Sequence, residues 1–212
     1  LMLPFSLLLV AQETETDEVE EVVVTGIKKS LISAIDIKRN NVGVVDAITA
    51  EDFGKFPDNN LAESLARVVG IGIDRSNVEG ERVAVRGFGP ELNLVTLNGR
   101  QMPTVPGQWG GGRSFNFGDI SSHGIAAVEV YKSTNSSLPS GGIGSTINMV
   151  TTKPLSIDGR LSSFSIDVLN DSTSNEDLKP ELNFVHSSNF GNFGFAISGS
   201  FQDRNNIEEG TR

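Results

Sequence analysis

In this 212-residue chain, the glycine-rich loop Gly141–Ser145 has residue types that could form a phosphate-binding site. Such loops can cradle phosphate groups with their backbone N–H groups. A Walker loop, however, needs a lysine after its last glycine, and here Ser145 follows Gly144. A dinucleotide-binding loop needs a third glycine that opens a helix, whereas Ile147–Val150 is typical of a strand. The sequence therefore does not support a nucleotide site.

The other reactive side chains are too few or too scattered to form a specific site. The two histidines, His123 and His186, lie far apart and have no partner at metal-ligand spacing. The chain has no cysteine, which excludes disulfides, thiolate metal sites and cysteine nucleophiles. Its formal net charge of -10 argues against nucleic acid as a partner, because phosphate backbones require clustered Lys and Arg. We therefore expect no enzyme, no metal site and no cofactor.

The first residues are typical of an exported protein. Residues 1–12 are apolar and too few to span a bilayer as a helix, and their length suits the hydrophobic part of a secretory signal whose start is missing. A buried N-terminal strand or helix is the alternative. Six of the nine residues in Glu13–Glu21 are acidic, so we expect a solvated, flexible leash over residues 13–29.

The leash contains an apolar segment with strong β-preference, Val22–Thr25, which is stopped by Gly26. A segment of this kind could pair with the sheet edge of another protein. It could equally be the first strand of this domain. The residue pattern alone leaves both interpretations open.

Short helices and short strands alternate in the next part of the chain, which predicts an α+β fold. A helix is expected from Ser30 to Arg39, and a second one has Leu61, Leu65 and Val68 on one face with Gly70 just past its end. The strands expected by their apolar patterns are Val44–Ile48, Ile71–Asp74, Ile125–Tyr131 and Thr146–Thr152.

The most distinctive stretch lies between these elements. Arg82–Val85 alternates as a half-buried strand, and Gly87–Pro90 then interrupts it. A second apolar run, Leu92–Leu97, ends at Asn98-Gly99, a strong indication of a tight hairpin turn. We expect the two runs to form a small sheet around the glycine-rich corner.

The segment Arg100–Asn116 has no periodicity and is too long for an ordinary connection. It holds the only tryptophan of the chain, Trp109. Aromatic side chains on loops often serve recognition, although such a ring can also pack back on its own domain. Binding and packing therefore both remain open for Trp109.

Beyond Ile157 apolar and small polar residues alternate in three runs, the clearest of which places Phe164, Ile166 and Val168 on one face. This alternation over about ten residues is typical of membrane β-barrel strands. The long polar segment Asn170–Pro180 and the short turn Asn189–Asn192 fit the long outer loops and short periplasmic turns of such barrels. A soluble antiparallel sheet with one wet face is the alternative.

Taken in order, these stretches resemble the TonB-dependent outer-membrane receptors. Glu20–Gly26 is similar to the TonB box. Further stretches resemble the plug motifs of that family: Asn60–Leu65 with Gly70–Ile73, Val83–Phe88 with Leu97–Arg100, Ile125–Tyr131, Pro139–Val150 and Lys153–Pro154.

The resemblance implies roles for individual residues. Partner binding falls on the TonB box, namely Glu21, Val22, Val23, Val24, Thr25 and Gly26. Ligand binding falls on the loop residues Gln101, Gln108, Trp109, Arg113 and Asn116. A structural role in the plug falls on Arg86, Gly87, Asn98, Gly99, Gly141, Gly142 and Gly144.

The resemblance also implies an architecture and a location. It divides the chain into a signal remnant (1–12), the leash with the TonB box (13–29), an α+β plug domain (30–156) and the first antiparallel strands of a transmembrane β-barrel (157–212). Since the family's barrels have about 22 strands, we expect the chain to be a fragment. The plug would lie inside the barrel in the bacterial outer membrane, with the N-terminus in the periplasm.

The function implied is active uptake of a scarce ligand through the plugged barrel. The implied partners are the periplasmic domain of TonB, within the TonB–ExbB–ExbD complex, outer-membrane lipid and a small ligand. The order of the motifs looks most like the oligosaccharide-uptake subgroup, with iron-siderophore receptors as the second choice. A free-standing periplasmic or surface glycan-binding α+β module is the alternative from another class.

Overall fold

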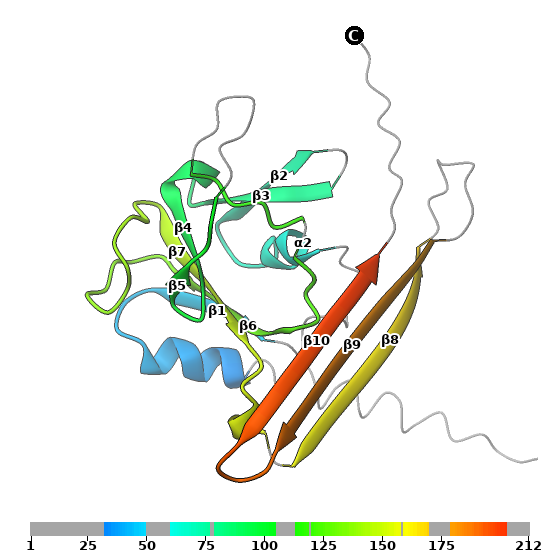
Figure 1. Ribbon diagram of the computed structural model, residues 1–212. Coiled ribbons are helices and arrows are strands. Elements are labelled where there is room, and N and C mark those ends of the chain that lie inside the picture. The colour runs from blue at the N-terminus through cyan, green and yellow to red at the C-terminus, as the bar shows by residue number, and fades with distance from the viewer. Residues whose placement is uncertain are drawn as a thin grey trace, which may run out of the picture.

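The computed structural model describes residues 32–49, 60–76, 79–104, 113–118, 120–157, 159–169 and 179–202. A five-stranded sheet, a two-stranded sheet and a short helix make up one part of the molecule, and a tilted three-stranded sheet lies beside them (Figure 1). None of the helices in these residues is long and apolar enough to cross a bilayer.

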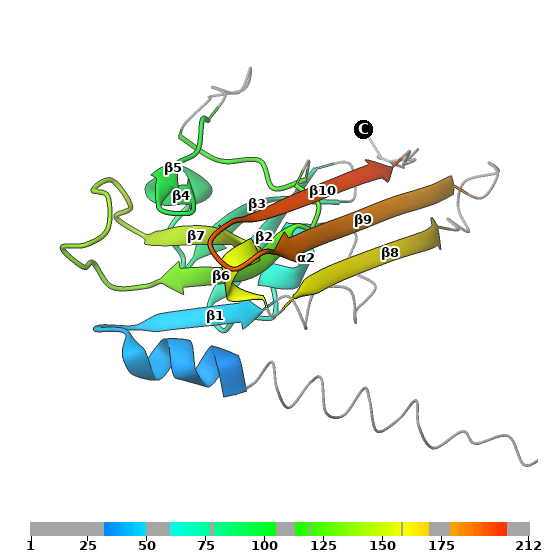
Figure 2. The same cartoon turned by 60° about the horizontal axis from the view of Figure 1, so that its bottom comes forward.

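The five-stranded sheet is mixed. Its strands, in spatial order, are β1 (Val45–Thr49), β6 (Ile125–Tyr131), β7 (Ser145–Thr151), β4 (Asn93–Leu97) and β5 (Arg100–Gln101). Neighbouring strands are antiparallel except β4 and β7, which run parallel. In chain order β1 is separated from its neighbour β6 by most of the other elements. Residues 32–40 form a helix that runs alongside β1 at this edge of the sheet (Figure 2).

The two-stranded sheet pairs β2 (Ile71–Ser76) with β3 (Glu79–Val85) and packs with helix α2 (Leu61–Leu65). The side chain of Asn60 caps α2 by accepting a hydrogen bond from the backbone N–H of Glu63, at 3.2 Å. The same side chain donates to the carbonyl of Gly80 in β3, at 2.8 Å. One buried amide therefore both starts the helix and fixes it on the hairpin.

The expected pairing of Arg82–Val85 with Leu92–Leu97 is wrong. β3 pairs with β2, while β4 pairs with β5 and β7, so the two apolar runs belong to different sheets. The reason lies in the connection between them. Arg86 and Gly87 both have positive φ angles, of 53° and 80°, and the 3-10 turn η1 (Pro90–Leu92) follows. These residues redirect the chain from one sheet to the other instead of folding it back on itself.

The second helix is shorter than its apolar pattern predicts. It ends at Leu65, and Val68 is buried in the core from the turn that follows. Gly70, with φ of 78°, leads directly into β2 and is not the helix C-cap. The carbonyls of Val69 and Gly70 accept hydrogen bonds from Lys132 and from the N–H of Arg86. After Leu65 the chain tightens into i→i+3 turns, in which the N–H groups of Arg67 and Val68 donate to the carbonyls of Ser64 and Leu65.

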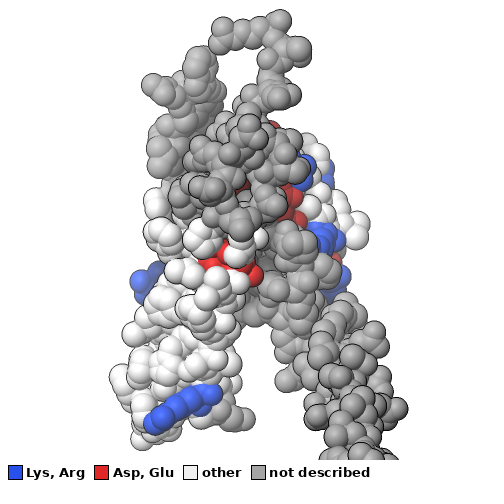
Figure 3. All heavy atoms as spheres, turned by 90° about the vertical axis from the view of Figure 1, so that its right-hand side faces the viewer, with Lys and Arg blue, Asp and Glu red and all other residues white. Residues whose placement is uncertain are grey.

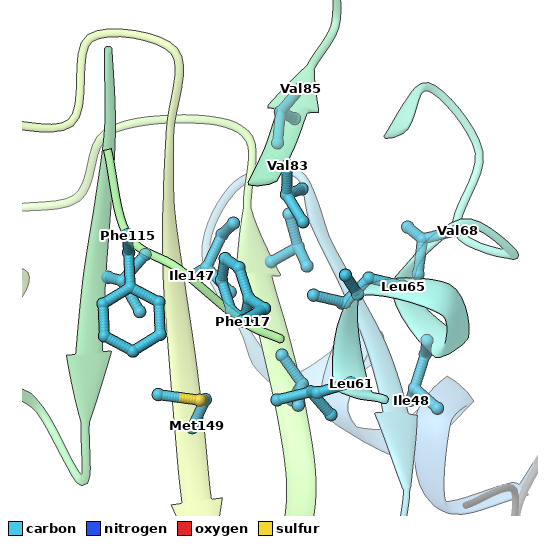
Figure 4. Close-up of a cluster of buried hydrophobic side chains, with 14 of the residues drawn as sticks. Ile48, Leu61, Leu65, Val68, Val83, Val85, Phe115, Phe117, Ile147 and Met149 are labelled. Atoms are coloured by element: carbon cyan, nitrogen blue, oxygen red, sulfur yellow. The ribbon is translucent and has the colours of Figure 1, made fainter. Parts of the chain in front are cut away.

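One apolar core lies between the two sheets and α2 (Figure 4). Phe117 is 1% exposed, and its ring lies between Ile147 of the five-stranded sheet and Leu65 of α2. Phe115 packs against it edge-on, with ring centroids 4.9 Å apart. The remaining core members are Ile48, Leu61, Ala62, Val68, Val83, Val85, Val95, Ile125, Val128, Val130 and Met149.

The three-stranded sheet has the order β10-β9-β8 and is antiparallel throughout. Its strands, β8 (Arg160–Leu169), β9 (Lys179–Asn189) and β10 (Gly194–Gln202), confirm the three runs expected after Ile157. A short turn joins β9 to β10. The 3-10 turn η2 (Pro154–Ser156) contacts both of these strands where the chain enters the sheet.

The side chain of Phe117 fills the space between the two sheets. Truncating it should leave a cavity that the surrounding side chains cannot fill. We expect Phe117→Ala to lower the free energy of unfolding by about 3–5 kcal/mol in urea denaturation. Val69→Ala, at a side chain 83% exposed, is the control and should change it by less than about 0.5 kcal/mol. Equal, small changes in both variants would show that Phe117 is not enclosed.

Candidate functional site

Arg86 and Gly144, two of the residues expected to form a structural motif, meet where β4 and β7 begin. Arg86 Nη2 donates to the carbonyl of Gly144 at 3.1 Å, and the N–H of Gly144 donates to the carbonyl of Leu92 at 3.0 Å. A Cβ atom on Gly144 would lie 2.6 Å from Asn93 Oδ1 and 2.7 Å from Phe88 Cβ. Glycine is therefore required here by close packing and not by a positive φ.

Asn93 is the buried centre of this junction, with 3% of its surface exposed. Its Nδ2 donates to the carbonyl of Val83 at 2.9 Å, and its Oδ1 accepts from Ser145 Oγ at 2.9 Å. This one side chain thus joins β3, β4 and β7. It was not among the residues singled out from the sequence, because an asparagine at the start of a strand looks like an ordinary turn residue.

The turn Asn98-Gly99 has positive φ angles of 52° and 78°, and β4 pairs with β5 across it, so the expected tight hairpin is confirmed. Asn98 Oδ1 accepts from the N–H of Thr151 at 3.0 Å. The N–H of Gly99 donates to Asn148 Oδ1 at 2.9 Å. A backbone N–H and an amide side chain of β7 therefore hold the hairpin in place.

The residues expected to bind a ligand are not all brought together among the described parts of the chain. Gln101 is exposed in β5. Arg113 Nη2 donates to the carbonyl of Gly141 at 3.2 Å, which places it against the glycine-rich loop Gly141–Ser145. Asn116 Nδ2 donates to Glu81 Oε1 at 3.2 Å. Gln108 and Trp109 lie outside the described residues, as does the TonB box, Glu21–Gly26. Their roles stay predictions.

An open cavity of about 220 Å³ lies between the five-stranded sheet and β10. Its walls are apolar on the side of the mixed sheet, with Met102 and Met149, and polar on the side of β10, with Ser198 and Ser200. A second open cavity, of about 430 Å³, lies along residues 134–146 and includes Gly141 and Gly142 in its lining. In the part of the chain that the structure describes, no group of three or more acidic or histidine side chains could hold a metal ion.

His123 links the mixed-sheet part of the molecule to the three-stranded sheet at the first cavity. Its Nδ1 lies 3.4 Å from Ser121 Oγ, and its Nε2 lies 3.4 Å from Ser165 Oγ in β8. Ser121 Oγ also donates to Asn183 Oδ1 in β9, at 3.5 Å. The polar face of the three-stranded sheet is thus the face turned toward the mixed sheet.

A charged group ties the N-terminal helix to the core, and we call Lys38, Asp46 and Lys132 the charged node. The carboxylate of Asp46, in β1, forms ion pairs with both ammonium groups. Lys132 is 8% exposed, and its Nζ also donates to the carbonyl of Val69. Sequence reasoning missed this group, although alternation places position 132 on the same inward face as Val128 and Val130. A lysine there has to find a carboxylate.

The charged node changes the protonation of Asp46. Burial of the carboxyl raises its pKa, but the hydrogen bonds and charges of Lys132 and Lys38 outweigh this effect, and the pKa lies below its usual 3.8. In β6, burial and the hydrogen bond to Glu129 raise the pKa of Tyr131 to about 12. Tyr131 therefore remains a neutral donor to Glu129 Oε2, at 2.8 Å, throughout the neutral range.

Residues 37–146, just over half of the chain, match the TonB-dependent receptor plug domain. The chain belongs to this plug-domain family. The match contains β1, α2, the β2–β3 hairpin and the mixed sheet up to the first residues of β7. A comparison with curated proteins found no match.

Solved receptor structures share the fold of the plug and of the strands that follow it. A mutant of the ferric enterobactin receptor PfeA from Pseudomonas aeruginosa matches with a TM-score of 0.60 at 19% identity, over 79% of this chain and 25% of that one. The siderophore receptor PirA from Acinetobacter baumannii gives 0.58 at 21% identity, over 79% and 25%. The copper transporter OprC gives 0.50 at 17% identity, over 68% and 21%.

These identities show the fold alone, and the chain spans about a quarter of the length of the receptors it matches. The expected fold class, an α+β plug followed by antiparallel strands, is confirmed. The expected domain boundaries, at residues 12, 29 and 156, stay predictions.

In the plug, Asp46→Asn would leave the buried ammonium group of Lys132 without its counter-charge. We expect the free energy of unfolding at pH 7 to fall by about 3 kcal/mol, the lower end of the range for a broken buried ion pair. The control is Asp36→Asn, at an exposed pair with Arg39, which should cost less than about 0.5 kcal/mol.

The difference in the free energy of unfolding between the unmodified protein and Asp46→Asn should shrink as the pH falls. Because the folded-state pKa of Asp46 is depressed, its contribution is complete above pH 3.8 and is lost as the pH falls further. Urea denaturation at several pH values should show the two proteins converging below pH 3.8. A difference that stays constant into strong acid would mean that the carboxylate charge is not the cause.

Gly144→Ala should strain the junction of the two sheets, because the added methyl group meets Asn93 and Phe88. We expect a loss of about 1–3 kcal/mol, the range for overpacking. Gly72→Ala is the matched control, since a Cβ there has no atom within 4 Å and no positive φ. Thermal unfolding measures both, and a Gly144 variant as stable as the Gly72 variant would refute the packing argument.

Proposed function

We propose that this chain is the gating part of a TonB-dependent outer-membrane receptor, in which the plug controls active uptake of a scarce ligand. The observation that carries the proposal is the two-faced character of the β8–β9–β10 sheet next to the plug. Its polar face contacts the plug through Ser165 and Asn183. Its other face is apolar and exposed, with Phe164, for example, 68% exposed.

Such a sheet suits a bilayer better than water. Lipid-facing strands of outer-membrane barrels carry apolar residues on one face and polar residues on the other. The apolar face here contains Phe164, Ile166, Val168, Leu182, Phe184, Ile197 and Phe201, whose exposed fractions run from 37% to 68%. On a soluble glycan-binding module, the same face would be a large uncovered apolar patch and an aggregation liability. The alternative module is therefore not favoured.

Energy would enter from the N-terminal side. Val22–Thr25 would add a strand to the periplasmic domain of TonB by backbone pairing, and pulling on the leash would then load the helix at residues 32–40. That helix is bound to the plug through Lys38, and β1 pairs with β6 alone at the edge of the sheet. In this arrangement, a pull on the leash would act on the β1 edge of the plug and remodel it there.

The ligand class does not follow from the plug fold. An oligosaccharide was expected from the order of the sequence motifs, and the comparisons add nothing to it. The solved structures named for a siderophore or for copper are at most 21% identical to this chain. Such an identity shows a shared fold and does not show a shared ligand. Iron-siderophore uptake is therefore the second candidate, and Gln101, Arg113 and Asn116 remain the described residues proposed to contact either ligand.

Binding of the leash to TonB tests the proposal directly. A peptide of residues 13–31 is titrated against the periplasmic domain of TonB by calorimetry, beside a Val24→Pro peptide and a Thr16→Pro control. Proline removes one backbone donor from the added strand, so Val24→Pro should weaken binding at least tenfold while Thr16→Pro leaves it unchanged. Failure of the unmodified peptide to bind at high concentration would refute the energy-coupling role.

A further inference from the structure

The exposed face of the β8–β9–β10 sheet changes its chemistry along the strands. Antiparallel register sets this face out in rows, because directly paired residues point to the same side. At the end of the sheet near Asn189, the first row is Arg160, Ser188 and Phe195 and the second is Ser162, His186 and Ile197. The following rows, toward the other end, are Phe164, Phe184 and Gly199, then Ile166, Leu182 and Phe201.

Charged and polar groups on this face occur only in the first two rows of the described strands. His186 is fixed between two hydroxyl groups, with Nδ1 2.9 Å from Ser162 Oγ and Nε2 3.1 Å from Ser188 Oγ. Its ring lies 5.6 Å from that of Phe195. Arg160 and Ser162 are exposed, so their donors can reach a group outside the protein. We call Arg160, Ser162 and His186 the cationic patch.

Aromatic rings frame the cationic patch on the side of the β9–β10 turn. Phe190 stacks on Phe193 and on Phe195, with centroid separations of 6.4 and 6.2 Å. Phe190 and Phe193 are 58% and 64% exposed. Aromatic rings at the ends of membrane strands lie at the level of the lipid headgroups. This places the cationic patch at the same depth, and not in the hydrocarbon.

We propose that the cationic patch binds the phosphate group of a membrane phospholipid in the leaflet next to the short β9–β10 turn. The inference rests on the proposed function, because it requires that the apolar face of the sheet contact a bilayer. The guanidinium of Arg160 would hold the phosphate with two parallel N–H donors. The hydroxyl of Ser162, positioned by His186, would supply a third donor.

The distribution of charge supports an anionic partner. The acidic residues of the described strands are Asp167 in β8 and Glu181 in β9, which lie directly opposite each other in the register. Their side chains are on the other face of the sheet, which is turned toward the plug. The outer face therefore has cationic and hydroxyl groups with no carboxylate beside them. Figure 3 shows one side of the molecule, where blue atoms lie at the lower end of a mostly white surface, red atoms lie higher, and further blue atoms lie to the left and right.

Polar groups on a lipid-facing strand also need a partner. A hydrogen-bonding group that faces hydrocarbon without one is costly, whereas at the headgroup level lipid phosphate can serve. The rows beyond Ser162 and His186 are apolar, so the acyl chains of the same lipid would lie along Phe164 and Phe184. One phospholipid molecule thus matches both the polar and the apolar parts of this face.

Lipid binding by the chain in detergent, followed by native mass spectrometry, tests the inference. Dioleoyl phosphatidylglycerol is compared with a lipid that has the same acyl chains and a neutral monoglucosyl headgroup without phosphate. We expect tighter binding of phosphatidylglycerol, and a loss of about fivefold in Arg160→Gln, as for one cation at a membrane surface. Arg100→Gln, at an exposed arginine of β5, removes the same charge elsewhere and should have no effect.

Four outcomes would overturn the inference, and they are distinguishable. Equal losses in both arginine variants would show a general charge effect, and equal binding of the two lipids would show that phosphate is not recognised. Competition by millimolar inorganic phosphate would assign the patch to free phosphate. Protease protection of β8–β10 in vesicles is measured in parallel: protection without headgroup preference overturns this inference alone, whereas no protection overturns the membrane role as well.

Discussion

The buried ammonium group of Lys132 is the constraint on which the N-terminal half of the plug depends. A charge placed among apolar side chains is tolerated only with a counter-charge and filled hydrogen bonds. Asp46 supplies the counter-charge, which requires β1 to lie against β6 in one register, and the carbonyl of Val69 supplies a further acceptor. Lys38 then attaches the N-terminal helix to the same carboxylate. One charge thus positions a helix, an edge strand and the turn after α2.

Two sheets share a single core because buried amides connect them. Asn60 joins α2 to β3, and Asn93 joins β3 to β4 and β7. Phe117 occupies the space between the sheets. The polar connections set the relative position of the sheets, while apolar burial supplies most of the favourable free energy. Glycine at position 144 is what allows the backbones to approach closely enough for this arrangement.

Alternation in the sequence was enough to predict most strands, since β1, β2, β6 and β7 and the three strands of the outer sheet appear where their patterns indicate. Alternation reports which face is buried but not which strand is the neighbour, so the separation of β3 from β4 could not be predicted. The early end of α2 lies in local i→i+3 turns, which the apolar pattern of the sequence does not report. Of the site, the Asn98-Gly99 turn was predictable from local turn chemistry, whereas the burial of Asn93 depends on contacts remote in sequence.

β1 pairs with β6 and β4 pairs with β7, so both strands pair with partners that come much later in the chain. This order affects how the plug folds. Asp46 and Lys132 are 86 positions apart, and Asn93 and Ser145 are 52 apart. Such distant contacts form slowly, because a long loop must close before any contact rewards it. A growing chain must therefore carry β1 and β4 with their apolar sides uncovered until β7 has emerged. During this delay the uncovered apolar surfaces and unpaired strand edges leave the half-made plug prone to aggregation.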